Sequence, residues 1–146
     1  PTGASYKNRA KQRIKAAMQV DAGSLQEYKS MGIKVMTEII EGGLEVIKGK
    51  KPKSNQAYLD YDCIGFPVIM KFWEGHGEKF FPLGLGGSKK LQDFFTDKKI
   101  PLGMRSSIPL FYDSRKLIWV AGYEIDDRVK LTAGTRKIFH IKIFKI

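Results

Sequence analysis

Residues 80–105 read FFPLGLGGSKKLQDFFTDKKIPLGMR, a glycine-rich turn that leads into a short amphipathic segment ending at a proline. Three apolar residues of this segment recur at helical spacing, Leu91, Phe94 and Phe95. Their spacing predicts a helix from Ser88 that packs one face on a sheet. The helix is expected to end before Pro101, because the residue that precedes a proline is pushed out of the helical region.

The segments on either side of this block favour strands. Alternating or continuous apolar runs predict strands at residues 33–39, 57–62, 66–73, 108–112, 117–122 and 139–144. Gly42-Gly43 is typical of a hairpin turn, with residues 44–47 as the returning strand. The expected fold class is therefore α+β, with a mixed, mainly antiparallel β-sheet and a few packed helices.

The first 32 residues differ in pattern from the rest. Residues 5–20 have apolar positions at helical spacing with basic residues between them, which predicts a basic amphipathic helix. Ser24 and Glu27 form a capping-box pattern that predicts a second short helix ending near Gly32. We therefore expect a helical segment over residues 1–32, followed by a domain over residues 33–146. The basic helix could contact RNA, dock on a neighbouring domain, or simply be solvated.

Charge is the most informative property of the composition. The 146 residues include 26 Lys and Arg against 15 Asp and Glu, a net charge of +11, with 42% hydrophobic residues. A compact, aromatic-rich chain of this charge favours a nucleic-acid partner over an anionic membrane, although lysine is also a common solubilising residue. A single cysteine, Cys63, permits no intrachain disulfide and indicates a reducing compartment. No apolar run is long enough to span a membrane, so we expect a cytoplasmic protein without a membrane partner.

The glycine-rich block is the best candidate for a binding site. Gly84, Gly86 and Gly87 leave backbone N–H groups uncovered by side chains, and Ser88 can cap a helix start. The turn is not a Walker loop, because the hydroxyl precedes the lysine, and a plain tight turn before a helix is the alternative. Basic residues are concentrated around it: Lys71, Lys79, Lys89, Lys90, Lys98, Lys99 and Arg105.

Other side chains carry no comparable signal. His76 and His140 are far apart and near no cysteine, and Asp126-Asp127 is followed directly by Arg128, which compensates its charge. No nucleophile, base and orienting group can be picked out together. We therefore expect no catalytic residue, no metal site and no bound cofactor in this chain.

The order of several short motifs resembles the C-terminal domain of bacterial tRNA(Ile)-lysidine synthetases. The motifs are Phe66-Pro67, Pro82-Leu83-Gly84, Lys89-Lys90-Leu91-Gln92-Asp93-Phe94-Phe95, Asp97-Lys98-Lys99-Ile100-Pro101, Ile108-Pro109-Leu110 and Trp119-Val120-Ala121-Gly122-Tyr123. The resemblance covers about the last ninety residues, with a family-like core over residues 57–146. It implies a mixed sheet with helices, similar to a domain in the β subunit of phenylalanyl-tRNA synthetase.

The resemblance also implies a function. The family is a bacterial ATP-dependent ligase for tRNA modification, which attaches lysine to the anticodon cytidine of an isoleucine tRNA to give lysidine. Its ATP and magnesium belong to a separate catalytic domain with a Ser-Gly-Gly-x-Asp-Ser loop, which does not occur here. This chain is then the tRNA-recognition fragment, which grips the acceptor stem, with that catalytic domain of the same parent chain as a further partner.

The same resemblance suggests which residues contact RNA. We expect Lys89, Lys90, Lys98, Lys99 and Arg105 at the phosphate backbone, near Gly86, Gly87 and Ser88, with Lys71 and Lys79 behind them. Lys71 stands where the family usually has an arginine, so it keeps the charge and loses the bidentate fork. One alternative remains: a docking or dimerisation module, possibly a homodimer, whose positive charge is incidental.

Overall fold

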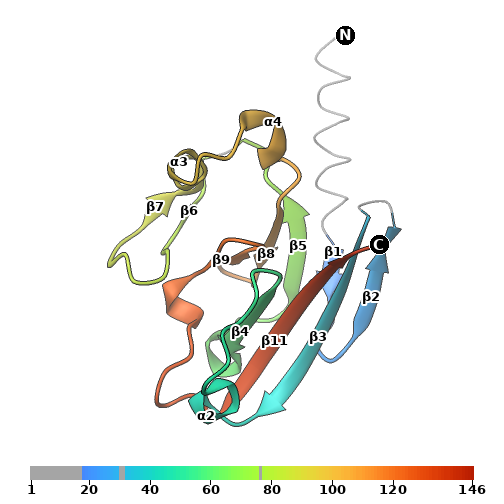
Figure 1. Ribbon diagram of the computed structural model, residues 1–146, viewed down its shortest axis with the longest axis vertical. Coiled ribbons are helices and arrows are strands. Elements are labelled where there is room, and N and C mark those ends of the chain that lie inside the picture. Colours follow the sequence, from blue (N-terminus) through green and yellow to red (C-terminus); the bar gives the residue numbers. More distant parts are fainter. Residues whose placement is uncertain (1–17, 30–31, 76) are drawn as a thin grey trace.

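The computed structural model describes residues 18–29, 32–75 and 77–146, and this part of the chain folds into two main antiparallel sheets and a short hairpin (Figure 1). The first sheet has the order β1 (Met18–Val20), β5 (Val68–Phe72), β8 (Pro109–Tyr112), β9 (Leu117–Val120) and β10 (Glu124–Ile125). The second has the order β2 (Leu25–Tyr28), β3 (Ile33–Glu41), β11 (Lys137–Lys145) and β4 (Gln56–Asp60). The hairpin joins β6 (Lys79–Phe80) and β7 (Lys89–Lys90).

Short helices complete the described fold and confirm the expected α+β class. They are the α-helices α2 (Leu44–Ile47), α3 (Leu91–Asp97) and α4 (Leu102–Arg105), and the 3-10 turns η2 (Tyr61–Cys63) and η3 (Asp127–Val129).

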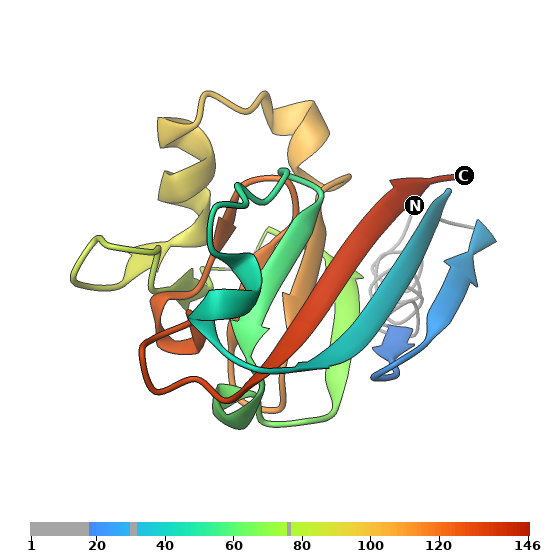
Figure 2. The same cartoon turned by 60° about the horizontal axis from the view of Figure 1, so that its bottom comes forward.

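The two long strands β3 and β11 are the spine of the second sheet. They pair from Lys137 opposite Glu41 to Lys145 opposite Ile33, and run side by side in Figure 2. Their inward residues Val35, Phe139 and Ile141 are fully buried. The strands expected at residues 33–39 and 139–144 are therefore confirmed.

The first sheet is a middle layer with both faces covered. In β8, Phe111 packs into the core shared with the second sheet, whereas its neighbour Leu110 packs against the α3 layer. In β9, Trp119 and Val120 divide in the same way. Strands buried on both faces carry continuous apolar runs, which explains why the Leu117–Val120 sequence LIWV does not alternate.

The helix predicted within residues 80–105 packs on this sheet, as expected. Leu91, Phe94 and Phe95 are buried, and Phe95 meets Trp73 edge to face with ring centroids 5.3 Å apart. Burial of one such side chain stabilises the fold by about 1.5–3 kcal/mol. The predicted start at Ser88 is wrong, because Lys89 and Lys90 form β7 and Leu91 is the first helical residue. No side chain caps this helix start.

The hairpin predicted at Gly42-Gly43 is wrong. Residues 44–47 form α2 instead of a returning strand, because β3 pairs with the distant β11. Gly42 N–H donates to the Arg136 carbonyl (2.9 Å), and a Cβ on Gly43 would lie 2.2 Å from the Thr135 carbonyl oxygen. The glycine pair therefore permits a close approach of two chain segments.

The capping-box prediction at Ser24 is also wrong. Leu25–Tyr28 is the strand β2, which pairs with β3, and the Ser24 hydroxyl donates to the Asp21 carbonyl instead of capping a helix. Of the basic helix expected at residues 5–20, positions 5–17 lie outside the described residues, and Met18–Val20 is β1, which pairs with β5.

Candidate nucleic-acid interface

The glycine turn between β6 and β7 has a backbone that its sequence requires. Gly84 and Gly86 have φ values of +76° and +81°, in the left-handed region that favours glycine. Gly86 and Gly87 have open space around them, since an added Cβ would meet nothing within 4 Å. A large ligand can therefore approach the backbone of the turn closely.

A buried carboxylate holds the base of this turn. Asp126 is fully buried and accepts hydrogen bonds from Phe81 N–H (2.9 Å) and from Nε and Nη2 of Arg128 (2.9 Å each). The Arg128 guanidinium lies 4.2 Å from the centroid of the Phe81 ring. These contacts tie the turn to η3, so it projects from a fixed support.

A second carboxylate reaches into the turn itself. Asp127 accepts a hydrogen bond from Gly84 N–H (3.2 Å) and one from Lys130 Nζ (3.0 Å). The Lys130 bond, followed by the backbone bond of Gly84, holds the pKa of Asp127 below its usual value. Because an acid occupies the Gly84 amide, an anionic ligand would meet the lysines of this block and not that backbone group.

Lys79 and Lys90 are the most distinctive pair of the hairpin. They lie directly opposite each other on β6 and β7, and both are exposed. Leu91 N–H donates to the Glu78 carbonyl (2.8 Å), so the adjacent Lys79–Lys90 pair is of the non-hydrogen-bonded kind, whose side chains are closest. Like charges directly opposite in a ladder are destabilising, and no ion pair within the described residues involves either lysine. An anion bound between them would relieve this repulsion.

Lys89 is engaged elsewhere, in a cavity on the other side of the hairpin. Its ammonium pairs with Asp97 at the end of α3. The cavity has a volume of about 380 Å³, and its lining includes Leu83, Lys89, Lys98 and Glu124. Burial raises the pKa of Glu124, while the hydrogen bond from the Ile125 N–H and the charge of Lys98 act in the opposite direction. Lys98 also lies over the Phe94 ring, 5.5 Å from its centroid.

The end of α3 presents two exposed lysines. Lys98 caps the helix, and its N–H donates to the Phe94 carbonyl (3.0 Å). Lys99 has a φ of +57°, and the following Ile100 N–H donates to the Phe95 carbonyl (3.0 Å). Glycine is the usual residue at such a helix end, and a side chain in this conformation costs about 1–2 kcal/mol. The fold therefore tolerates strain at an exposed lysine.

Arg105 lies in a different environment from these lysines. Only 7% of its surface is exposed, its Nε donates to the Ile100 carbonyl (3.0 Å), and its Nη2 donates to Thr96 Oγ1 (3.4 Å). Its guanidinium joins α4 to the end of α3. The position expected from sequence, at an RNA phosphate, needs an exposed guanidinium, and Arg105 does not provide one.

Lys71 and Lys79 line a second cleft, of about 340 Å³, together with Tyr112 and Arg115. The Lys71 ammonium lies 4.6 Å from the centroid of the Tyr112 ring, and the Tyr112 hydroxyl donates to Glu78. Burial, followed by the bond to Glu78, raises the pKa of Tyr112. Lys71 is thus half-buried beside an aromatic ring, and it lines a different cleft from Lys89 and Lys98.

Sequence reasoning missed Arg115, because it lies in what reads as a plain polar turn between two strands. It reaches this cleft because β8 pairs with β5, which carries Lys71. Only the strand pairing brings them together, and no spacing in the sequence signals it.

Within the described ranges, no group of three or more His, Cys, Asp and Glu side chains could hold a metal ion. None of the described helices is long and apolar enough to cross a membrane. His140 is buried in the second sheet, with Nδ1 2.7 Å from Glu38 and Nε2 2.9 Å from Gln56.

Comparison with known proteins identifies tRNA(Ile)-lysidine synthases as relatives. The family described as TilS substrate C-terminal domain matches residues 68–142. A tRNA(Ile)-lysidine synthase of Caldanaerobacter subterraneus is 39% identical over 88 residues, which cover 60% of this chain and 19% of the relative. One of Geobacter sulfurreducens is 32% identical over 104 residues, covering 68% of this chain and 22% of the relative. The chain thus spans about a fifth of the length of these relatives.

Two solved structures share the fold. The crystal structure of a TilS C-terminal domain superposes with a TM-score of 0.73 at 19% identity, covering 89% of this chain and 96% of that one. An N-terminal fragment of the phenylalanyl-tRNA synthetase β subunit of Pyrococcus horikoshii has a TM-score of 0.56 at 21% identity, covering 75% and 38%. The expected likeness in fold to a domain of that subunit is confirmed.

Proposed function

Because the chain belongs to the TilS substrate C-terminal domain family, we propose that it is the tRNA-recognition part of a ligase that attaches lysine to the anticodon cytidine of an isoleucine tRNA. The proposal places this ligase in the bacterial cytoplasm. It assigns ATP and magnesium to a catalytic domain of the parent protein, which is then a partner of this domain. No residue described above is assigned a step in the chemistry.

Binding of the tRNA acceptor stem is carried by one observation. Exposed lysines without an ion pair in the described part of the chain converge on the hairpin and the end of α3: Lys79, Lys90 and Lys99. A double-stranded RNA stem hides its base edges in a deep, narrow groove and offers phosphates and 2′-hydroxyls. Lysines on a rigid hairpin and helix end suit recognition of such a shape.

The remaining residues of the block take different parts in this proposal. Lys98 adds charge beside Lys99. The open space at Gly86 and Gly87, with the exposed Ser88 next to them, lets a phosphodiester chain approach closely. Lys89 contributes less, because Asp97 already neutralises it. Lys71 acts from the second cleft, next to Lys79, and Arg105 supports the fold.

The decisive experiment is a salt titration of tRNA binding with charge-neutralising variants. Lys90→Gln combined with Lys99→Gln should weaken binding about tenfold at low salt, since each neutralised phosphate contact adds counterion release. The slope of log affinity against log salt should fall by about two.

The matched control is Lys29→Gln with Lys145→Gln, two exposed lysines, one directly after β2 and one at the end of β11. It has the same change in net charge and should leave the affinity nearly unchanged. If both pairs of substitutions weaken binding equally, the affinity depends on the net charge of the protein and not on Lys90 and Lys99. A binding constant insensitive to salt would favour the docking or dimerisation module, which the comparisons do not favour.

A further inference from the structure

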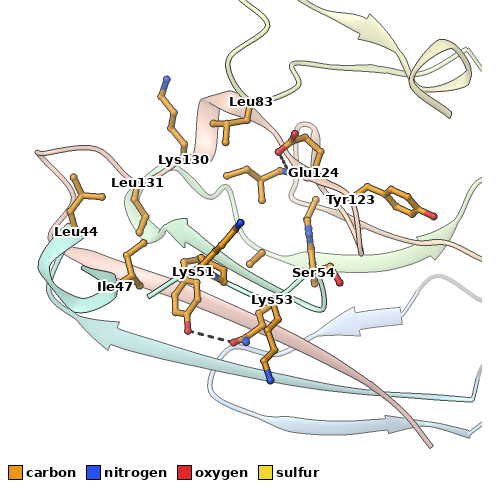
Figure 3. Close-up of a pocket in the computed structure, with 16 residues that line it drawn as sticks. Leu44, Ile47, Lys51, Lys53, Ser54, Leu83, Tyr123, Glu124, Lys130 and Leu131 are labelled. Carbon is orange, nitrogen blue, oxygen red and sulfur yellow. Dashed lines mark hydrogen bonds between the residues drawn. The ribbon is translucent and has the colours of Figure 1, made fainter. Parts of the chain in front are cut away.

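A third and larger cavity lies between the edges of the two main sheets (Figure 3). It has a volume of about 620 Å³ and lies between the segment from α2 to β4 on one side and the β9–β10 turn with the chain after η3 on the other. Its apolar lining includes Leu44, Ile47, Tyr58, Leu83, Ile125 and Leu131. Leu44 and Leu83 are 43% and 46% exposed, so this lining is open to a ligand.

The rim of this groove is positively charged. Lys51, Lys53 and Lys130 line it, against one carboxylate, Glu124. Lys51 and Lys53 are exposed, and no ion pair within the described residues involves them. An apolar floor with a basic rim matches a ligand that has flat apolar faces and a negatively charged backbone.

The groove adjoins the cavity beside the hairpin. Leu83 and Glu124 line both, so a chain that leaves the hairpin beside Lys98 can continue past Leu83 into the larger groove. Leu83 belongs to the glycine turn, and Glu124 to the edge strand β10. The turn and the edge strand therefore lie between the two cavities.

We propose that this groove binds the unpaired 3′ nucleotides of the RNA whose duplex lies on the lysines of the hairpin. The proposal rests on the proposed function, because it assumes an RNA stem on that surface. Bases pack on the apolar lining, as in proteins that bind single strands, and Lys51 and Lys53 contact the phosphates between them.

The chemistry of the lining supports a nucleobase as the occupant. The Tyr58 ring is held in place by stacking on His140, with centroids 4.2 Å apart and planes 7° from parallel, so the groove has a fixed aromatic wall. Packing of a base on such a side chain is tolerant of sequence, because every base has an apolar face. Glu124, at the junction, can accept a hydrogen bond from an exocyclic amino group.

The test compares three RNA hairpins with the same stem: one blunt, one with four unpaired 3′ nucleotides, and one with four unpaired 5′ nucleotides. The 146-residue chain should bind the 3′-extended hairpin at least about fivefold more tightly than the blunt one. The 5′ extension adds the same charge and should add less than half of that gain. Equal affinity for the blunt and 3′-extended hairpins overturns the proposal.

Substitutions in the groove test whether the gain in affinity from the 3′ extension arises there. Leu44→Glu, and separately Lys51→Glu with Lys53→Glu, should remove the gain from the 3′ extension and leave the affinity for the blunt hairpin within about twofold. The matched controls are Leu25→Glu, at an exposed leucine on β2, and Lys48→Glu with Lys50→Glu; both make the same change in charge outside the groove. A gain that survives both groove variants overturns the proposal.

Failure of this proposal and failure of the proposed function give different results. If blunt and extended hairpins bind equally, RNA duplex binding by the hairpin lysines is supported and nucleotide binding by the groove is overturned. If an unpaired tetranucleotide binds and the blunt hairpin does not, the groove stands without the duplex surface. If no RNA binds, both proposals are overturned. If an acidic apolar peptide binds in the groove and the 3′ extension adds no affinity, the groove proposal alone is overturned.

Discussion

Arg105 shows that residue type alone does not determine the role of a charge. It lies in the same basic block as Lys90 and Lys99, yet it is buried and its guanidinium donates to the Ile100 carbonyl. Arginine suits this place because it has several donors in a fixed fork and is more weakly hydrated than lysine. The lysines nearby keep their ammonium groups in water. Charge on the exposed residues is thus available to a partner, and charge on Arg105 is used by the fold.

Replacement of Arg105 by methionine should therefore destabilise the protein and spare RNA binding. Arg105→Met leaves the Ile100 carbonyl without its donor, and a buried acceptor that loses its partner costs about 1–3 kcal/mol. Urea denaturation measures this loss of unfolding free energy, and a titration with tRNA under folding conditions should give the wild-type affinity. Lys99→Met is the control, with the opposite pattern. A stable Arg105→Met protein that binds tRNA weakly would contradict this assignment.

At the scale of elements, the β6–β7 hairpin places two like charges opposite each other, at the cost of stability. Lys79 and Lys90 repel each other across the ladder, although Phe80 on the opposite face is fully buried and anchors the hairpin. A similar strain occurs at Lys99, which has a positive φ at the end of α3. Both unfavourable features lie at exposed lysines, as is common where local strain serves a function.

Reversal of one charge in the hairpin should relieve that repulsion. Lys79→Glu places opposite charges across the ladder, which should raise the unfolding free energy by about 0.2–1 kcal/mol. The same change should weaken tRNA binding several-fold, because the phosphate contact proposed for Lys79 becomes repulsive. The measurements are the urea midpoint and the affinity at low salt. The neutral Lys79→Gln should fall between the two proteins in both, and a variant that gains stability without loss of affinity would remove Lys79 from the interface.

At the scale of the whole molecule, strands near the start of the described chain complete both sheets. β1 pairs with β5 and β2 pairs with β3, and they bring Val20 and Tyr28 into the main core. Val20 is 2% exposed and Tyr28 is 7% exposed. These residues lie outside the segment matched by the family, which begins at residue 68, and they still belong to the same packed layers.

Truncation tests how much the fold depends on these strands. A chain that begins at residue 29 lacks both buried side chains, so it should lose at least about 3 kcal/mol of unfolding free energy relative to a chain that begins at residue 18. It should also associate, because the edges of β3 and β5 become open to pairing. Urea denaturation and size-exclusion chromatography measure the two effects. Equal stability of the two truncated chains would place the domain start after β2.

Prediction from sequence succeeded where a pattern reports burial directly. The apolar spacing of Leu91, Phe94 and Phe95 gave the helix and its buried face, and the long runs gave β3, β8, β9 and β11. It failed where a local signal competed with a distant partner. The capping box at Ser24 and the glycine pair before α2 both favour a local structure, and both are overridden by pairing with strands far along the chain.

The sequence by itself determined the fold class, the family and the concentration of lysines around the glycine turn, because periodicity, motif order and charge are properties of neighbouring residues. Only the tertiary structure decided which of those charges are free. Lys89 pairs with Asp97, and Arg105 donates a hydrogen bond to the Ile100 carbonyl. Strand pairing places Lys79 opposite Lys90, and it brings Arg115 into the same cleft as Lys71. The groove between the edges of the two sheets exists only after both have formed. The physical reason is that exposure and electrostatic pairing depend on distance in space, which the spacing of residues along a chain does not fix.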